Sequence, residues 1–327
     1  MSAAAQAAPV RVDLRPKRIH NFIRPLVVKP RSKVRLPESF DPGFTAGLSS
    51  EDGAGAQEVL RQGVELLAAY QERLAAERTH GLVVILQAMD AAGKDGTIRH
   101  VMSGVNPQGV DVNSFKQPSS EELDHDYLWR YARRLPARGK IGIFNRSYYE
   151  DVLVVRVHPS LLERQRLPAA AITPGIWSRR FREINDWEHY LTDNGFELVK
   201  LFLNVSKEEQ RRRFLSRIEE TEKNWKFSAA DAAERQYWDD YQDAFSDVLT
   251  HTSTEWAPWY VIPADRKWFA RIAAAAVIAD ALIGIDPQFP SIGGAAKAAL
   301  KDAKRQLEAE VSHGRRGKGR RAGRNRN

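Results

Sequence analysis

The sequence predicts an α/β fold with a central parallel sheet, and two observations lead to it. Short apolar, β-branched runs alternate with segments of helical spacing, which implies right-handed crossovers and helices on both faces of the sheet. A loop of small residues around one lysine directly follows the first run. The five predicted strands are residues 82–86, 110–115, 141–144, 198–203 and 259–262.

Helices are predicted between these strands. Apolar residues at three- and four-residue steps give an amphipathic helix over 56–77, and another is predicted over 120–135. Residues 206–209 read SKEE, a capping box that begins a further helix. Because ligands of parallel sheets bind at the carboxyl ends of the strands, the polar residues after each strand are the candidates for a site.

The segment after the first strand has the build of a phosphate-binding loop. Residues 90–97 read DAAGKDGT and lead into a helical pattern. In such a loop, backbone N–H groups and a helix N-terminus face an anion, and the lysine, here Lys94, reaches its outer phosphates. The alternative is an ordinary strand-to-helix turn in which Asp95 only complements the helix dipole.

Two positions depart from the usual phosphate-loop pattern. Ala88 stands where that pattern has glycine, and Asp95 stands where it has a Ser or Thr whose hydroxyl serves Mg²⁺. Since Mg²⁺ takes one or two carboxylates besides phosphate oxygens and water, Asp90 and Asp95 are the predicted metal ligands. The loop itself would then hold the ion.

Composition excludes several kinds of protein. The 327 residues include no cysteine, so disulfides, thiolate catalysis and a cysteine zinc site are excluded, and a cytoplasmic location is expected. The N-terminus has no basic-then-apolar signal region. The longest apolar stretch, 272–285, is alanine-rich and is interrupted by Asp280, so no membrane contact is expected.

Much of the net charge of +8 lies near the ends of the chain. Residues 1–55 alternate Lys and Arg with proline and predict a basic extended arm, which either packs on the body or guides a polyanion. An α/β domain is expected over 56–290 and a helix over 291–313. The tail, 314–327, has seven Lys/Arg and no acid, so it should be disordered and is the expected place for any nucleic-acid contact.

Three segments should meet at one edge of the sheet: the loop, the turn after the third strand and the helix that begins at the capping box. Lys, Arg and Mg²⁺ neutralise charge in phosphoryl transfer, and a phosphate acceptor needs no general base. A solvated basic face is the alternative for the helix. The side chains concerned are Asp90, Lys94, Asp95, Asn145, Arg146, Glu150, Asp151, Arg211, Arg212, Arg213 and Arg217.

Four stretches, taken together and in this order, resemble the family-2 polyphosphate kinases. They are AMDAAGKDGT, GKIGIFNRSYYEDVLVVRVH, SKEEQRRRFLSRIE with NWKFSAAD, and STEWAPWYVIPADRKWFAR. The resemblance covers residues 22–285. It implies a P-loop kinase fold related to thymidylate kinase, a three-layer sandwich with a helical lid over 206–250. It also implies Mg²⁺-dependent, reversible transfer of a terminal phosphoryl group between inorganic polyphosphate and a nucleotide.

The resemblance assigns roles to individual residues. Asp90, Lys94 and Asp95 match the family's loop acids and lysine, Arg146 matches the arginine of its second motif, and Arg213 matches its lid arginine. These five are the catalytic candidates. The candidates for polyphosphate binding are Gly93, Lys94, Gly96, Thr97, Arg213, Arg217 and Lys226. The candidates for nucleotide binding are Asn145, Glu150, Asp151, Lys116 and Arg130, of which the last two could instead be exposed helix charges.

The second motif differs from the form that many family members have. Its residues 145–150 read NRSYYE where that form is DRSWYN, which resembles the class that phosphorylates both AMP and ADP. Glu150 is the residue expected to broaden acceptor use. The predicted function is therefore a polyphosphate-dependent kinase that makes ADP and ATP, acting as a homo-oligomer, either a dimer or a tetramer. The alternatives are an ATP-dependent nucleoside monophosphate kinase and a polyanion- or RNA-binding module.

Overall fold

The computed structural model describes residues 16–48 and 53–319, without the side chains of 53–56, Lys226 and 310–319. The chain divides into two compact units at Gln288, and each is described by itself. The first fifteen residues of the predicted arm and residues 320–327 of the predicted tail lie outside the described part of the chain.

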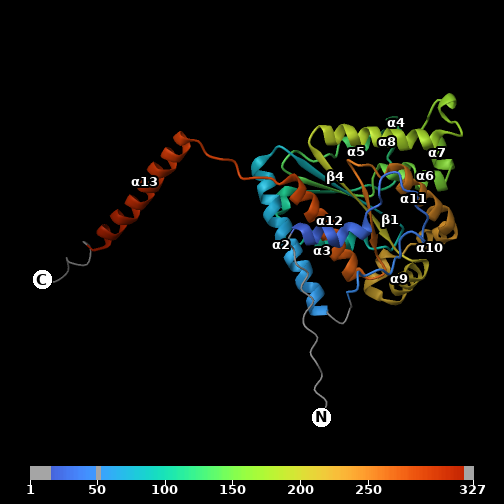
Figure 1. The fold of residues 1–327 in the computed structure, drawn as a ribbon, viewed down its shortest axis with the longest axis horizontal. Helices are drawn as coiled ribbons and strands as arrows, with labels where there is room; N and C mark the ends of the chain where they lie inside the picture. The colour runs from blue at the N-terminus through green and yellow to red at the C-terminus, as the bar shows by residue number, and fades with distance from the viewer. Residues whose placement is uncertain (1–15, 49–52, 320–327) are drawn as a thin grey trace, which may run out of the picture. The chain divides into compact units, whose positions relative to one another are not determined.

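A five-stranded sheet, parallel throughout, forms the centre of the larger unit (Figure 1), and its strand order is β2-β3-β1-β4-β5. All five predicted strands are confirmed. Leu86 of β1 lies opposite Asn145 of β3 and Leu201 of β4, so the carboxyl ends of the central strands are in register. The strands are β1 Gly81–Ala88, β2 Val110–Ser114, β3 Ile141–Asn145, β4 Phe196–Asn204 and β5 Trp259–Pro263.

Helices cover both faces of this sheet, which confirms the three-layer sandwich. Leu82, Val84 and Leu86 of β1 pack in one apolar cluster with α2 (Gly53–Glu77), α3 (Lys94–Val101) and α12 (Lys267–Ile285). Val83 and Ile85 point the other way and pack with α8 (Ile176–Asp193) and α11 (Trp238–Thr252). Because strand side chains alternate between faces, an unbroken apolar run becomes a strand buried on both sides.

Helix α12 is long and apolar enough to cross a membrane by length and composition alone. In the structure it packs against α2, α3 and β4, and 61% of its most apolar window is buried. Burial in the protein core is thus sufficient to explain its apolar composition.

Short helices connect the layers. They are α1 Pro16–Ile23, α4 Ser120–Asp124, α5 Trp129–Ala132, α6 Val154–Val157, α7 Ser160–Glu163, α9 Lys207–Glu219 and α10 Ala229–Ala233. The 3-10 turns are η1 Arg24–Leu26, η3 Pro107–Gly109, η4 Tyr148–Asp151, η5 Ala169–Ala171, η6 Thr221–Lys226 and η7 Glu234–Tyr237. The segment expected to form a lid consists of α9, η6, α10, η7 and α11.

The single helix predicted over 120–135 is wrong. Ser119 and Glu122 form a capping box that begins α4, but the chain becomes extended at His125. The Asp126 side chain then accepts a hydrogen bond from the backbone N–H of Leu128 at 2.9 Å. An aspartate that bonds its own backbone favours a turn over a continuous helix, so two short helices form.

The described part of the N-terminal arm, residues 16–48, packs on the body. Its first turns are the helix α1 on α12 rather than extended chain, which corrects the prediction there. Val28 donates its N–H to the carbonyl of Trp259 at 2.8 Å, and Leu36 donates its N–H to Ser246 at 3.0 Å. These contacts favour the packing role over a polyanion guide.

The second unit holds one long helix, α13 (Gly294–Gly319). The helix predicted over 291–313 is therefore present, but it begins later and continues six residues into the segment expected to be disordered. Lys and Arg are compatible with a helix, so charge alone did not end it.

Candidate active site

The loop between β1 and α3 has the backbone of an anion-binding turn. Ala91 and Gly93 have left-handed φ angles of 58° and 109°, and α3 begins directly afterwards at Lys94. A side chain at Gly93 would be strained at this φ, because only glycine adopts it freely. The N–H of Thr97 bonds to the carbonyl of Gly93 at 2.9 Å and closes the first helical turn.

Lys94 lies across its own loop. Its Nζ donates to the carbonyl oxygens of Ala88 at 2.9 Å and Met89 at 3.4 Å. Burial, and after it the nearby charge of Arg146, lower the pKa of Lys94, while Asp90 and other carboxylates oppose the shift. The ammonium group therefore sits in the loop, where an anion would relieve its poor solvation.

Arg146 connects the ends of β1 and β3. Its backbone is left-handed, with φ 66°, and its N–H bonds to the carbonyl of Leu86 at 3.0 Å. The guanidinium donates to Asp90 at 3.1 Å and to Glu150 at 3.2 Å, and Gln87 donates to the other oxygen of Glu150 at 3.0 Å. Glu150 is the main cause of a raised Arg146 pKa, so this arginine is always charged.

The two predicted metal ligands lie on either side of the loop. Asp90 bonds Arg146, and the exposed Asp95 accepts a hydrogen bond from Nδ2 of Asn145 at 2.7 Å. Two carboxylates beside a phosphate loop fit Mg²⁺, which completes its shell with phosphate oxygens and water. Nowhere in residues 16–48 and 53–319 do three or more His, Asp or Glu side chains gather as a metal site.

Helix α9 supports the loop from the lid side. Ser206 accepts a hydrogen bond from the N–H of Glu209 at 3.1 Å, as its capping role predicts. In a full capping box the Glu209 side chain would accept the N–H of Ser206. Here the Asp265 carboxylate accepts that N–H at 2.7 Å instead, so the predicted box is only half formed. The Glu209 carboxylate instead bonds Arg213 at 2.8 Å.

Arg213 lies beneath the loop and is only 7% exposed. Its Nη1 donates to the carbonyl oxygens of Ala91 at 3.1 Å and Ala92 at 2.7 Å. The amide of Gln210, one turn earlier, donates to the carbonyl of Asp90 at 3.0 Å. In this conformation Arg213 therefore positions the loop backbone, and Gln210, which sequence reasoning did not select, does the same.

A cleft of about 450 Å³ opens between the loop, the second motif and the lid. Asp90, Arg146 and Glu150 line one wall, and Arg235 and Tyr241 of the lid line the other. The predicted lid thus covers the predicted loop. Lid residues of this kind carry no local sequence signal, because only the tertiary fold brings them to the cleft.

The far end of the cleft has a hydrogen-bonded cluster that sequence reasoning missed. Glu234 Oε1 lies 2.5 Å from Nε2 of His158 and accepts the hydroxyl hydrogen of Tyr241 at 2.6 Å. Arg235 donates to Gln210 at 2.6 Å. His158 is the last residue of the quoted second motif, which was the one available signal for it.

Three of the predicted nucleotide-binding residues are placed away from the cleft. Asp151 is buried behind it, bonded by Gln165 at 2.6 Å, and burial raises its pKa to about 6. Arg130 donates to the carbonyl of Lys116 at 2.9 Å and lies over the Phe115 ring. Asp151 and Arg130 are thus structural in this conformation, and Lys116 is exposed outside the cleft.

The remaining candidates belong to the lid and the loop. Arg217 of α9 lies 3.8 Å from Asp231 of α10. The side chain of Lys226 is outside the described residues. Gly96 and the buried Thr97 lie in the first turn of α3, whereas the sequence placed them in the loop before that helix.

A parallel sheet, a phosphate loop, an arginine beside it and a helical lid define a P-loop phosphotransferase. The chain belongs to the family described as polyphosphate kinase 2, whose sequence model matches residues 49–290. This membership confirms the resemblance found in the four motifs and the fold that it implied.

Named relatives agree with this assignment. The chain is 52% identical over 274 residues to an ADP-polyphosphate phosphotransferase of Rhodopseudomonas palustris, covering 84% of this chain and 93% of the relative. It is 44% identical over 265 residues to an AMP/ADP-polyphosphate phosphotransferase of Meiothermus ruber, covering 80% and 94%. The crystal structure of polyphosphate kinase 2 from Arthrobacter aurescens is 42% identical, has a TM-score of 0.72 and covers 85% of this chain and 98% of that one.

Proposed function

We propose that the protein transfers the terminal phosphoryl group of inorganic polyphosphate to AMP and ADP, giving ADP and ATP. The observation that carries this proposal is the position of Arg146, which faces the cleft at the end of the phosphate loop between two carboxylates. The relatives named for ADP alone and for AMP and ADP support the donor and the class of acceptor. Exchange of one phosphoanhydride for another is nearly balanced, so the reaction is reversible.

The residues around the loop divide the chemical work. Lys94 would exchange its carbonyl contacts for phosphate oxygens, and Arg146 would exchange carboxylates for the moving phosphoryl group. Gln210 and Arg213 would keep the loop open by holding its carbonyl oxygens away from the anion. Asp90 and Asp95 would hold Mg²⁺, which neutralises charge on phosphate oxygens when bound.

The position of Glu150 supports the proposal that both AMP and ADP are acceptors. Its carboxylate lines the cleft and is fixed by Arg146 on one oxygen and Gln87 on the other. A fixed negative charge there disfavours a further phosphate group on the acceptor and so favours the shorter AMP. Replacing it, in Glu150→Asn, should raise the ratio of ADP turnover to AMP turnover, measured with polyphosphate as the donor. A ratio equal to that of the wild type contradicts this role.

The test is a reaction that contains purified protein, Mg²⁺, AMP and long-chain polyphosphate, with no ATP added. ADP followed by ATP should appear by chromatography, and Lys94→Ala and Asp95→Asn should abolish both products. Lys140→Ala is the matched control, because Lys140 pairs with Asp111 at the amino ends of β2 and β3, away from the loop. ATP formed only when ADP is supplied would contradict the AMP claim.

A second arm supplies ATP and a nucleoside monophosphate without polyphosphate. A rate in this arm that exceeds the polyphosphate-driven rate would contradict the proposed donor and favour an ATP-dependent kinase. We also propose a cytoplasmic location, which fits a chain without cysteine, and a homo-oligomer, either a dimer or a tetramer. Light scattering after gel filtration tests the assembly, and a monomer at assay concentration contradicts it.

A further inference from the structure

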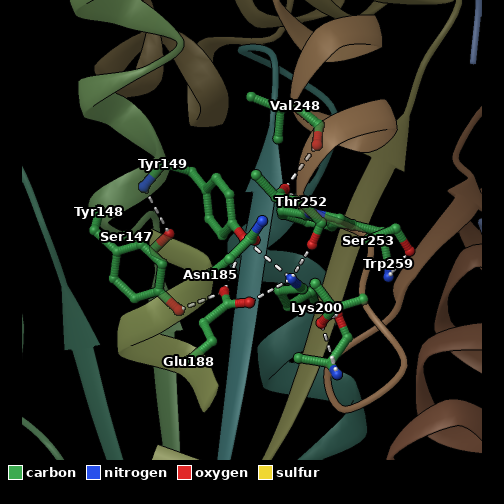
Figure 2. A network of polar contacts seen from close by, with 12 residues as sticks. Ser147, Tyr148, Tyr149, Asn185, Glu188, Lys200, Val248, Thr252, Ser253 and Trp259 are labelled. Atoms are coloured by element: carbon green, nitrogen blue, oxygen red, sulfur yellow. Dashed lines mark hydrogen bonds and ion pairs between the residues drawn. The ribbon is translucent and has the colours of Figure 1, made fainter. Parts of the chain in front are cut away.

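A fully buried polar network lies behind the cleft, and the proposed chemistry does not use it (Figure 2). The ammonium of Lys200 on β4 bonds the Glu188 carboxylate on α8 at 2.6 Å. Neither side chain has any exposed surface. Tyr148 donates its hydroxyl hydrogen to Glu188 at 2.8 Å, and Tyr149 does so at 2.7 Å.

All three donors of Lys200 and both oxygens of Glu188 have a hydrogen-bond partner. The three donors of Lys200 go to Glu188, to the Tyr149 hydroxyl at 3.0 Å and to the carbonyl of Thr252 at 2.6 Å. The ammonium also lies 5.4 Å from the ring centroid of Trp259. Complete pairing is what allows an ion pair to remain charged in a core.

Stability alone is a poor explanation for this pair. Removing two charges from water has a large desolvation penalty, and apolar side chains of similar size commonly stabilise a core as well or better. The bonds of a buried charged pair are directional, so such a pair can also fix the relative positions of the elements that it joins. Here these are α8, β4, the end of α11 and the second motif.

The network holds two of the three residues that separate Arg146 from Glu150. Tyr148 and Tyr149 stand between them in the chain, and both hydroxyls reach backward to Glu188. Arg146 itself has a left-handed backbone, an uncommon state for a residue other than glycine. A turn with this backbone keeps its shape only if its surroundings hold it.

The same network reaches the last helix of the lid segment. Thr252, at the end of α11, gives its carbonyl to Lys200 and accepts the indole N–H of Trp259 on its hydroxyl at 2.9 Å. Helix α11 also carries Tyr241 and Phe245, which line the cleft. One set of bonds therefore joins the second motif to the helix on the opposite side of the cleft.

We propose that Glu188 and Lys200 are positioning residues for phosphoryl transfer. Through the hydroxyls of Tyr148 and Tyr149 they fix the turn that places Arg146 and Glu150 in the cleft, and through Thr252 they set the distance of that turn from α11. The inference rests on the proposed function only for its activity readout.

The first test removes one hydroxyl. Tyr149→Phe should lower kcat roughly 10- to 100-fold with KM for AMP within about twofold, as expected when a catalytic group is misplaced by about 1 Å. Tyr127→Phe is the matched control, since Tyr127 also donates to a glutamate of α8, Glu183, at 3.1 Å but is not part of the network. A Tyr149→Phe enzyme with the kcat of the control overturns the proposal.

The second test asks whether the network acts through Arg146. In an Arg146→Ala background, adding Tyr149→Phe should lower kcat no further, because there is no guanidinium left to misplace. Independent losses that multiply in the double variant overturn the positioning role. A merely structural bond would produce such multiplied losses or no loss in either background.

The third readout does not depend on turnover. In a crystal structure of Tyr149→Phe, the Arg146 guanidinium should leave its position beside Asp90 while the sheet stays unchanged. An unchanged Arg146 overturns the inference. A wild-type protein that lacks polyphosphate-driven activity would overturn the proposed function alone, since this crystallographic comparison still decides the positioning role.

Discussion

Two clusters of charge, one in the cleft and one behind it, behave in opposite ways. In the cleft, the side chains of Arg146 and Asp90 are 38% and 28% exposed, and water reaches both. Behind it, Lys200 and Glu188 are 0% exposed. An exposed pair can exchange one partner for a phosphate oxygen at little cost, whereas a buried pair cannot. The charges in the cleft are therefore suited to binding a phosphate group, and the buried cluster is suited to holding neighbouring elements in fixed positions.

The pKa directions describe the same contrast. The carboxylates of Glu150 and Asp90 raise the pKa of Arg146, so its charge is favoured where it stands. Burial lowers the pKa of Lys200, although Glu188 opposes the shift. The charge of Arg146 is stabilised by its carboxylate neighbours, whereas the charge of Lys200 persists in the core because each of its donors has a partner.

Breaking the buried pair should have the largest effect on stability. Lys200→Met leaves the Glu188 carboxylate buried without its cation, and the free energy of unfolding should fall by about 3–5 kcal/mol. Urea denaturation of the variant and the wild type in one buffer measures the loss. The double variant Glu188→Gln, Lys200→Met removes both charges and should be more stable than Lys200→Met alone. A loss under about 1 kcal/mol in Lys200→Met is what an exposed ion pair would give, and it would contradict the claim that the buried pair differs from the cleft pair.

Breaking the cleft pair should instead affect the rate. Arg146→Ala should lower kcat by about 10³-fold or more, which corresponds to about 4 kcal/mol of barrier. Because the arginine is partly exposed, the free energy of unfolding should change by only about 0.5 kcal/mol. Steady-state kinetics with polyphosphate and ADP, paired with urea denaturation, separate the two effects. A folded variant with near wild-type rate removes Arg146 from the site.

Asp151 is buried, like Lys200 and Glu188, and its ionisation should therefore make the free energy of unfolding depend on pH. Burial raises its pKa from 3.8 to about 6, so ionisation opposes folding. The penalty is absent below pH 3.8, grows as the pH rises to 6 and is complete above that. Its size is at most about 3 kcal/mol.

Asp151→Asn mimics the protonated carboxyl and tests this directly. The variant should be more stable than the wild type at pH 8, and the difference should shrink as the pH falls through about 6. Urea denaturation at a series of pH values measures it. A difference that does not vary with pH would show that the carboxylate of Asp151 is not destabilised by burial.

Strands β1, β3, β4 and β5 could be predicted because burial on both faces leaves a plain local mark, as in residues 82–86. Helix α8 could not, since the residues that it buries include Arg180 and Glu188 as well as Ile184 and Leu191. Charged residues on the buried face hide the apolar period that identifies a helix. The prediction of one helix over 120–135 was wrong for the reverse reason. The helical pattern continues through Asp126, and it does not show that this side chain bonds the backbone and forms a turn.

The site follows the same rule. Asp90 and Arg146 follow strands β1 and β3 closely, and Asp95 lies in the first turn of the helix after β1, so topology alone places them at one edge. The positions of Arg213 beneath the loop and of Tyr241 in the cleft depend on how the lid folds back, which has no local pattern. Lys200 was a signal that could have been used, since a lysine within the apolar 198–203 run requires a buried partner.

The smallest expected effect concerns helix α9, which supports the loop from the lid side. It carries the buried Arg213 and Gln210 to the loop, and its first turn is capped by Ser206. Ser206→Ala should lower the free energy of unfolding by about 1 kcal/mol. If α9 positions the loop, kcat should fall as well, whereas Ser119→Ala, at the cap of α4, which does not line the cleft, should leave kcat unchanged. Equal kcat in both variants would mean that α9 covers the cleft without positioning the loop. Arg213 would then be grouped with Arg146, as a side chain that can exchange its partners for a phosphate oxygen, and not with the residues that hold the geometry of the site.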